Sequence, residues 1–78
     1  MHSDSRFLDP EFNTAEAAQF LGSSVPTLER LRASGGGPRF AKYGPRTIRY
    51  KRSALLAWRE AHTFGNLSEA RALQGAAL

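Results

Sequence analysis

The sequence contains no cysteine and two histidines, so it offers few of the side chains that form disulfides or bind transition metals. Without cysteine the chain cannot form a disulfide or a thiolate metal site, which fits a reducing cytoplasm. His2 and His62 are 60 positions apart, and neither has a neighbour at the spacing of metal ligands. We therefore expect neither a metal nor another cofactor.

Long apolar runs are also missing. No stretch approaches the roughly 18 apolar residues of a transmembrane helix, and the N-terminus lacks the basic and then apolar pattern of a signal peptide. No acid–base pair, nucleophile constellation or metal set has a spacing suited to catalysis, so we do not expect an enzyme. A length of 78 residues allows one small domain.

Positive charge is concentrated in one segment. The formal net charge is +4, and eight of the eleven basic residues lie within residues 30–52, which contain no Asp or Glu. They are Arg30, Arg32, Arg39, Lys42, Arg46, Arg49, Lys51 and Arg52. Each one alone is more simply a solvated surface charge, but together they favour a polyanionic partner. We expect that partner to be double-stranded DNA.

The first predicted helix spans residues 12–21. Asn13 is a good N-cap, and Glu16, three positions later, has the spacing of a capping box. Gly22 ends the helix, because glycine adopts the left-handed conformation at low cost.

A second helix is predicted over residues 25–34. Ser24 is its expected N-cap, and Pro26 lies in its first turn, where the missing N–H costs little. Two short helices joined by the glycine–serine turn of residues 22–24 match a helix-turn-helix motif. A purely structural helical hairpin is the alternative.

A β-hairpin is predicted after the second helix. Residues 39–43 and 47–51 form its strands, joined by the turn residues 44–46, and Arg46 occupies the tip. Lys42 has the same parity as an apolar residue of the first strand. The sequence leaves open whether strand twist or a bulge turns Lys42 outward.

The remaining segments are simpler. A third helix is expected over residues 53–63, with Trp58 as the largest element of the core. The domain then covers residues 12–63, preceded by a flexible arm (residues 1–11) and followed by a tail that is partly helical or disordered (residues 64–78).

Several spaced motifs resemble one family. Residues 12–24 resemble the opening helix and turn of the MerR-like, excisionase-type winged helix-turn-helix domains. Gly37-Pro38, Lys42, Gly44-Pro45-Arg46, Arg49-Tyr50-Lys51-Arg52-Ser53 and Leu55…Ala57-Trp58 resemble the wing and the closing helix of that family. The resemblance implies an α+β fold, a small winged helix-turn-helix of three helices with a two-stranded β-hairpin wing between helix 2 and helix 3.

The resemblance also implies a function. The second helix is expected in the major groove and the wing at an adjacent minor groove. Small members of the family include excisionases (recombination directionality factors), which bind side by side on an attachment site, bend it and direct a tyrosine integrase toward excision. We expect an excisionase in a bacterial or phage context, acting at the nucleoid, with double-stranded DNA, other copies of itself and a tyrosine integrase as partners. No membrane or small-molecule substrate is expected.

Two other functions stay open. An AlpA-type transcriptional regulator needs the same domain, and a basic protein-interaction module needs the same charge. The chain departs from the family pattern at Arg32, where an apolar residue is common, and at Leu56, where an acidic residue is common. We expect Leu56 to serve contact between copies.

The expected DNA contacts fall into three sets. Base contacts are expected from Val25, Pro26, Thr27, Glu29 and Arg30. Minor-groove contacts are expected from Pro45, Arg46 and Thr47. Phosphate contacts are expected from Ser24, Arg32, Arg39, Lys42, Arg49, Lys51 and Arg52. No catalytic or metal-binding residue is expected.

Overall fold

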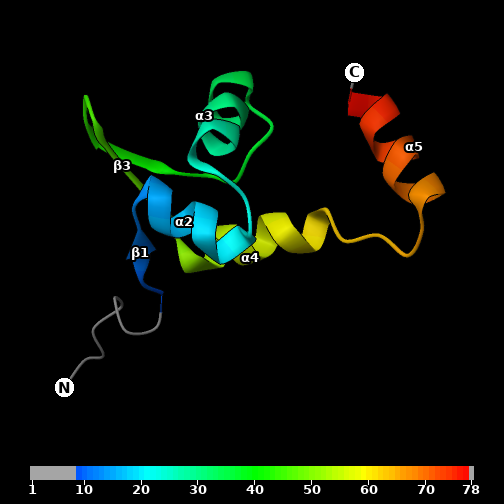
Figure 1. Ribbon diagram of the computed structural model, residues 1–78, viewed down its shortest axis with the longest axis horizontal. Helices are drawn as coiled ribbons and strands as arrows, with labels where there is room; N and C mark the ends of the chain where they lie inside the picture. Colours follow the sequence, from blue (N-terminus) through cyan, green and yellow to red (C-terminus); the bar gives the residue numbers. More distant parts are fainter. Residues whose placement is uncertain (1–8, 78) are drawn as a thin grey trace.

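The computed structural model describes residues 9–77. Its elements in chain order are β1 (Glu11–Phe12), α2 (Thr14–Leu21), α3 (Val25–Ser34), β2 (Ala41–Gly44), β3 (Thr47–Lys51), α4 (Arg52–Ala61) and α5 (Leu67–Ala77). The fold is a small α+β arrangement in which the β2–β3 hairpin lies between α3 and α4 along the chain, as the sequence predicts. Helices α2, α3 and α4 gather around the sheet, while α5 stands apart from them (Figure 1).

The caps at the two ends of α2 are the predicted ones, although the helix begins at Thr14 rather than at residue 12. The Asn13 side-chain oxygen accepts a hydrogen bond from the Glu16 N–H (2.8 Å), and the Glu16 carboxylate accepts one from the Asn13 N–H (2.9 Å). This reciprocal pair is the predicted capping box. Gly22 follows the helix with φ at +69°, the left-handed conformation that favours glycine and lets the chain turn into α3.

Helix α3 has the predicted bounds, Val25–Ser34. The Ser24 hydroxyl accepts a hydrogen bond from the Thr27 N–H (3.3 Å), so Ser24 is the N-cap. Gly35 ends the helix, and its N–H donates to the Leu31 carbonyl (2.9 Å). The two helices and their short turn therefore form a helix-turn-helix.

The sheet has three antiparallel strands in the order β1-β3-β2, not the two strands that the sequence predicts. The extra strand is β1, in which Glu11 pairs with Lys51 and Phe12 with Tyr50. A strand of two residues is too short to show an alternating pattern. Residue 11 was therefore predicted to lie in the arm and residue 12 in the first helix. Of the predicted flexible arm, residues 1–8 lie outside the described part.

A bulge in the hairpin settles the facing of Lys42. Strand β2 begins at residue 41 rather than 39, and its residues Lys42 and Gly44 pair with Ile48 and Thr47. Tyr43 is therefore the extra residue of a bulge, and Lys42 is exposed to solvent. Of the two possibilities that the sequence left open, a bulge is present.

The core lies where α2, α3 and α4 meet the face of β3. Its buried residues are Ala17, Ala18, Leu28, Tyr50 and Leu55. The two alanines let the helices approach closely, and Tyr50 is the largest of the fully buried side chains. The core is therefore assembled from one or two residues of each of these four elements, α2, α3, β3 and α4.

The prediction that Trp58 is the largest core element is wrong. Trp58 lies one turn beyond Leu55 on α4 and is half-buried. Its indole N–H donates to the Gly36 carbonyl (2.9 Å), and its ring stacks on His62 with centroids 4.2 Å apart. Trp58 thus connects the loop after α3 to α4 at the margin of the core, and the Gly36 carbonyl satisfies its polar N–H.

Helix α4 is capped from outside its own segment. The Asp9 carboxylate accepts hydrogen bonds from the Ser53 N–H and the Ser53 hydroxyl, both at 2.8 Å. These bonds lower the pKa of Asp9, with a smaller contribution from the positive charges of Lys51 and Arg52. The cap fixes residues 9–10 on the domain, helped by an Arg52 N–H bond to the Pro10 carbonyl (2.9 Å).

The tail, predicted to be partly helical or disordered, contains helix α5. The Asn66 side chain accepts a hydrogen bond from the Glu69 N–H (3.0 Å) at its start. The extents of the molecule, 47 × 30 × 19 Å, reflect the position of α5 beyond the end of α4 (Figure 1). Within residues 9–77, no helix has the length and apolar character needed to cross a membrane.

Candidate nucleic-acid interface

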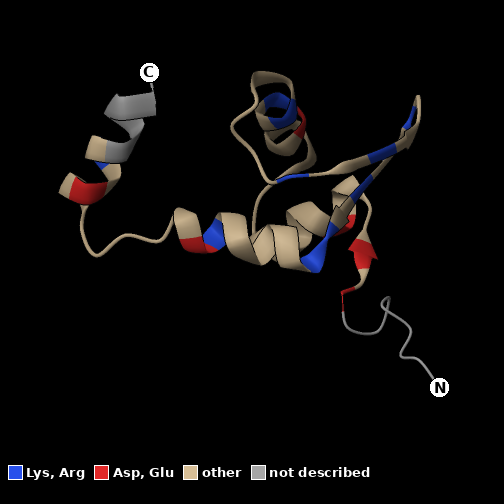
Figure 2. Cartoon of the chain, turned by 180° about the vertical axis from the view of Figure 1, so that it is seen from behind, with Lys and Arg blue, Asp and Glu red and all other residues tan. Residues whose placement is uncertain are grey.

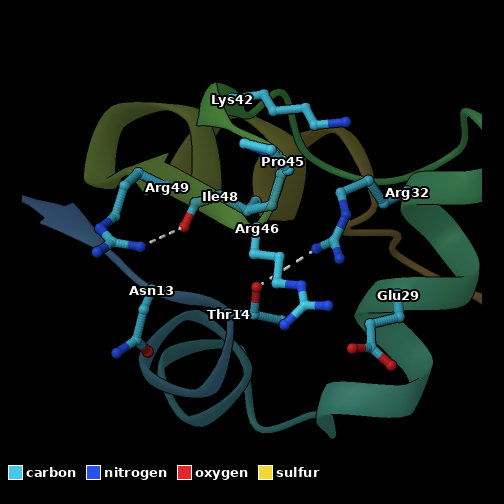
Figure 3. Close-up of a pocket in the computed structure, with 9 residues that line it drawn as sticks. All are labelled: Asn13, Thr14, Glu29, Arg32, Lys42, Pro45, Arg46, Ile48 and Arg49. Atoms are coloured by element: carbon cyan, nitrogen blue, oxygen red, sulfur yellow. Dashed lines mark hydrogen bonds between the residues drawn. The ribbon is translucent and has the colours of Figure 1, made fainter.

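A groove of about 410 Å³ runs between α3 and the β2–β3 hairpin, and we call it the wing groove. Its lining residues are Asn13, Thr14, Glu29, Arg32, Lys42, Pro45, Arg46, Ile48 and Arg49 (Figure 3). Four of them are basic and come from two separate elements, α3 and the hairpin. The fold therefore brings together cations that are up to 17 positions apart in the sequence and gives the groove a positive wall.

The outer surface of α3 carries one stripe of exposed side chains. Its members are Pro26, Glu29, Arg30 and Ala33, which occupy positions i, i+3, i+4 and i+7 of one helix face. Leu28 lies on the opposite face and is buried, with 1% of its surface exposed. Three of the residues predicted to contact bases therefore lie on the free face of the helix.

The other two predicted base contacts lie differently. Val25 is half-buried and packs against the core. Thr27 is also half-buried, and its hydroxyl accepts a hydrogen bond from the Ser24 hydroxyl (2.9 Å). Both side chains support the start of α3. They are less accessible to a partner than Pro26 or Arg30.

Arg32 is half-buried, although it was predicted to point outward as a phosphate contact. Its Nη1 donates to the Tyr50 hydroxyl (3.0 Å) and to the Thr14 hydroxyl (3.3 Å). The guanidinium carbon also lies 5.8 Å from the centre of the Phe40 ring. Arg32 thus joins α3 to β3 and to the start of α2. The sequence did carry a signal of this role, because an apolar residue is common at this position in the family that the chain resembles.

The tip of the hairpin presents the three predicted wing residues to solvent. Pro45, Arg46 and Thr47 are all exposed. Along the same hairpin, Lys42 is exposed, and the Arg49 Nη1 donates to the Ile48 carbonyl (2.8 Å), which orients the guanidinium. Figure 2 shows basic residues on α3 and along the hairpin.

A side-chain hydrogen bond across the sheet stiffens the wing. The Tyr43 hydroxyl donates to the Glu11 carboxylate at 2.6 Å. This bond joins β2 to β1 across the central strand β3. It also raises the pKa of Tyr43, because the neighbouring carboxylate favours the protonated phenol. The wing is therefore held by side chains as well as by the β-ladder.

The eight clustered cations do not all lie in the wing groove. Arg39 and Lys51 line a second groove beside α4, and Arg52 is exposed at the start of α4. These three were predicted as phosphate contacts, but none of them lines the wing groove that Lys42 and Arg49 line, so we do not count them among the proposed DNA contacts. Conversely, Asn13 was predicted only as an N-cap and Thr14 was not predicted as a contact, yet both line the wing groove because α2 begins beside α3. Helix N-termini often bind phosphates, so the position of these two residues at the start of α2 was the signal that could have indicated a contact.

The family of the chain follows from a comparison with protein-family models. The model for the helix-turn-helix domain matches residues 11–63. The chain belongs to the helix-turn-helix domain family. The match begins at β1 and ends just after α4, so it covers the whole fold described above except α5. No curated protein matches the chain.

Helix-turn-helix domains of this family occur in excisionase-like and phage DNA-binding proteins. Membership makes DNA the expected class of partner, and domains of this kind are typically not enzymes. In the helix-turn-helix domain of this chain, α2 and α3 are the two helices of the motif, and the wing groove lies beside the second one.

Proposed function

We propose that the protein binds double-stranded DNA with α3 in the major groove and the tip of the wing in the adjacent minor groove. The observation that carries this proposal is the wing groove, whose basic side chains come from α3 and from the hairpin. Two elements that meet at one positive groove offer contacts to two neighbouring parts of a duplex. The membership of the helix-turn-helix family supports the same partner.

The proposed base contacts are the exposed polar residues of α3. Arg30 has the planar fork that pairs with guanine, and Glu29 accepts hydrogen bonds from cytosine. Both lie on the free face of the helix. Pro26 stands at the start of the same stripe and contributes shape rather than a hydrogen bond.

The proposed backbone and minor-groove contacts come from the hairpin and the helix start. Lys42 and Arg49 face the wing groove and supply sequence-independent attraction to phosphates. Arg46 at the exposed tip suits a narrow A/T-rich minor groove, where the potential is most negative. The N-terminus of α3 next to Ser24 offers a further phosphate contact.

Within this DNA-binding role we propose an excisionase, a protein that binds an attachment site as several adjoining copies, bends it and directs a tyrosine integrase toward excision. One domain of this size covers roughly 600–1,000 Å² of interface, which rarely gives tight specific binding alone. The exposed Leu56 and Leu67 (39% and 70% of their surfaces) offer apolar contacts for adjoining copies. An AlpA-type transcriptional regulator is the alternative.

Two measurements test the proposal. Nuclease footprinting of the DNA beside the gene should show adjoining protected segments that fill cooperatively, with enhanced cleavage where the duplex bends. A single site that fills non-cooperatively would contradict the cooperative part. Adding the protein to a recombination reaction with the neighbouring integrase should raise excision and lower integration. Unchanged recombination together with altered transcription of a nearby promoter would favour the regulator.

A further inference from the structure

A second groove lies between the start of β2 and the first turns of α4, and the proposed DNA contacts leave it free. It encloses about 580 Å³ and shares no lining residue with the wing groove. In β2, Ala41 lines this second groove while its neighbour Lys42 lines the wing groove. Successive strand residues point to opposite faces, so the hairpin separates the two grooves. We call the second one the α4 groove.

The floor of the α4 groove is apolar. It consists of Phe40, Ala41, Ala54 and Ala57. Phe40 leaves 43% of its surface exposed, yet its ring is held against the buried Tyr50 at a centroid distance of 6.2 Å. A fixed aromatic ring beside small alanines forms a preformed hollow for an apolar side chain.

The rim of the α4 groove is positive. Arg39 and Lys51 flank the floor, and both are exposed. The apolar floor favours a peptide over DNA, because a phosphate backbone gains little from apolar contact. Since β2 is an edge strand of the sheet, an extended peptide also finds backbone groups beside the groove.

Most acidic residues of the described chain are poorly placed to complement the α4 groove of a second copy. Four carboxylates of the described chain already accept hydrogen bonds within it. They are Asp9, Glu11, Glu16 and Glu69. Glu29 lines the wing groove and faces the proposed DNA site, so Glu60 is the one exposed carboxylate among residues 9–77 that has neither role. A partner with its own acidic residues therefore complements the rim better than this chain does.

We propose that the α4 groove binds an acidic segment of a partner protein, with an apolar side chain of that segment seated on Phe40, Ala54 and Ala57. A copy bound to DNA through α3 and the wing then presents this groove to the partner at the same time. The inference does not depend on the DNA-binding proposal, because the two grooves use different residues.

Fluorescence anisotropy with a synthetic peptide tests this site on the full chain. The probe is a short fluorescein-labelled peptide in which glutamates flank two leucines, and its control has serines in place of the leucines. We expect the leucine peptide to bind and the serine peptide to bind at least about tenfold more weakly, the factor that corresponds to 1.4 kcal/mol. Equal affinities for the two peptides would show that binding depends on charge alone and not on the apolar floor, which would overturn the proposal.

Matched variants locate the binding. Ala57→Glu places a bulky negative group on the floor and should weaken the leucine peptide at least about tenfold. Ala61→Glu makes the same change at an exposed alanine of α4 that lines neither groove, and should leave the affinity within about twofold. Equal effects of the two changes, in variants with unchanged thermal unfolding, would place the peptide elsewhere and overturn the site.

A duplex titration distinguishes this inference from the proposed function. Changing Arg39 and Lys51 together to glutamine should weaken the peptide and leave duplex affinity nearly unchanged. If that double variant instead loses duplex affinity and the peptide does not bind, the α4 groove belongs to the DNA interface and the inference fails. If the peptide binds as expected while the protein binds no duplex, the inference stands and the proposed function fails.

Discussion

Arg32→Ala should destabilise the protein far more than Arg30→Ala, although both residues lie on α3. Arg32 donates two hydrogen bonds and lies against the Phe40 ring, whereas Arg30 is exposed. A hydrogen bond from a charged group contributes about 1.5–3 kcal/mol, and the half-exposed position of Arg32 puts each bond at the lower end. The variant also leaves the hydroxyl of the buried Tyr50 without this partner.

Together these losses amount to about 2–3 kcal/mol, while a surface change such as Arg30→Ala costs within about 0.5 kcal/mol. For a chain of 78 residues the free energy of unfolding is on the order of 4–12 kcal/mol. Arg32 therefore carries a large share of the total. Its removal should also loosen α3 from β3, and with it the spacing between the recognition helix and the wing.

Urea unfolding monitored by circular dichroism measures these effects. The midpoint should fall for Arg32→Ala with an unchanged m-value, which marks a change in stability rather than in the exposed surface. A double-mutant cycle with Tyr50→Phe isolates the bond between the two side chains, and we expect a coupling of about 1 kcal/mol or more. An Arg32→Ala cost as small as that of Arg30→Ala, or a coupling near zero, would refute the assigned role.

Three further predictions concern the wing tip, the Asp9 cap and the loop after α3. Arg46→Ala should weaken binding mainly at sites with a narrow minor groove, measured by gel-shift titration of duplexes that differ in groove width; equal loss on all of them would make it a plain phosphate contact. The folded-state pKa of Asp9 is lowered from 3.8 by the Ser53 bonds, so the cap stabilises above that value and is lost as the pH falls through the folded pKa. The difference in unfolding free energy between wild type and Asp9→Asn should therefore shrink in acid, and a difference independent of pH would contradict the cap. Gly37→Ala would bring its Cβ to 2.9 Å from the Leu31 Cβ, so we expect a loss of about 1–3 kcal/mol in urea unfolding, and an unchanged midpoint would show that the loop yields freely.

Local signals in the sequence predicted most of the helical part of the fold. The capping box of Asn13 and Glu16, the Ser24 cap and the left-handed glycine after α2 each act within a few residues, so they can be read without tertiary structure. The same holds for β3, whose alternation is visible in residues 47–51. These elements have the predicted positions because no long-range contact opposes their local preferences.

Features that depend on distant contacts were not predictable in this way. Strand β1 forms because its two residues pair with the edge of β3 that β2 does not cover. The Asp9 cap joins two residues that are 44 positions apart. Trp58 was wrongly predicted as the largest core element, because the size of a side chain does not show how far a small core extends along α4. Arg32 was read as a surface charge because its partners, Thr14 and Tyr50, come from two other elements.

The site was predictable as a group of cations but not as a shape. The sequence shows an uninterrupted positive segment, yet six of its eight cations are divided between two grooves, and Arg30 and Arg52 line neither. Strand alternation and the bulge at Tyr43 decide which side chain faces which groove. The positions of the charges along the sequence do not reveal that division. Both the proposed DNA site and the proposed peptide site depend on it.

The salt dependence of DNA affinity tests the central claim, that the wing groove is the duplex-binding surface, most directly. The slope of log K against log salt should flatten by about 0.9 for each phosphate contact removed when Lys42, Arg46 and Arg49 are changed to glutamine. The matched variant with Arg39 and Lys51 changed to glutamine should keep the wild-type slope. Equal flattening in both variants, or a slope that neither one alters, would contradict the claim.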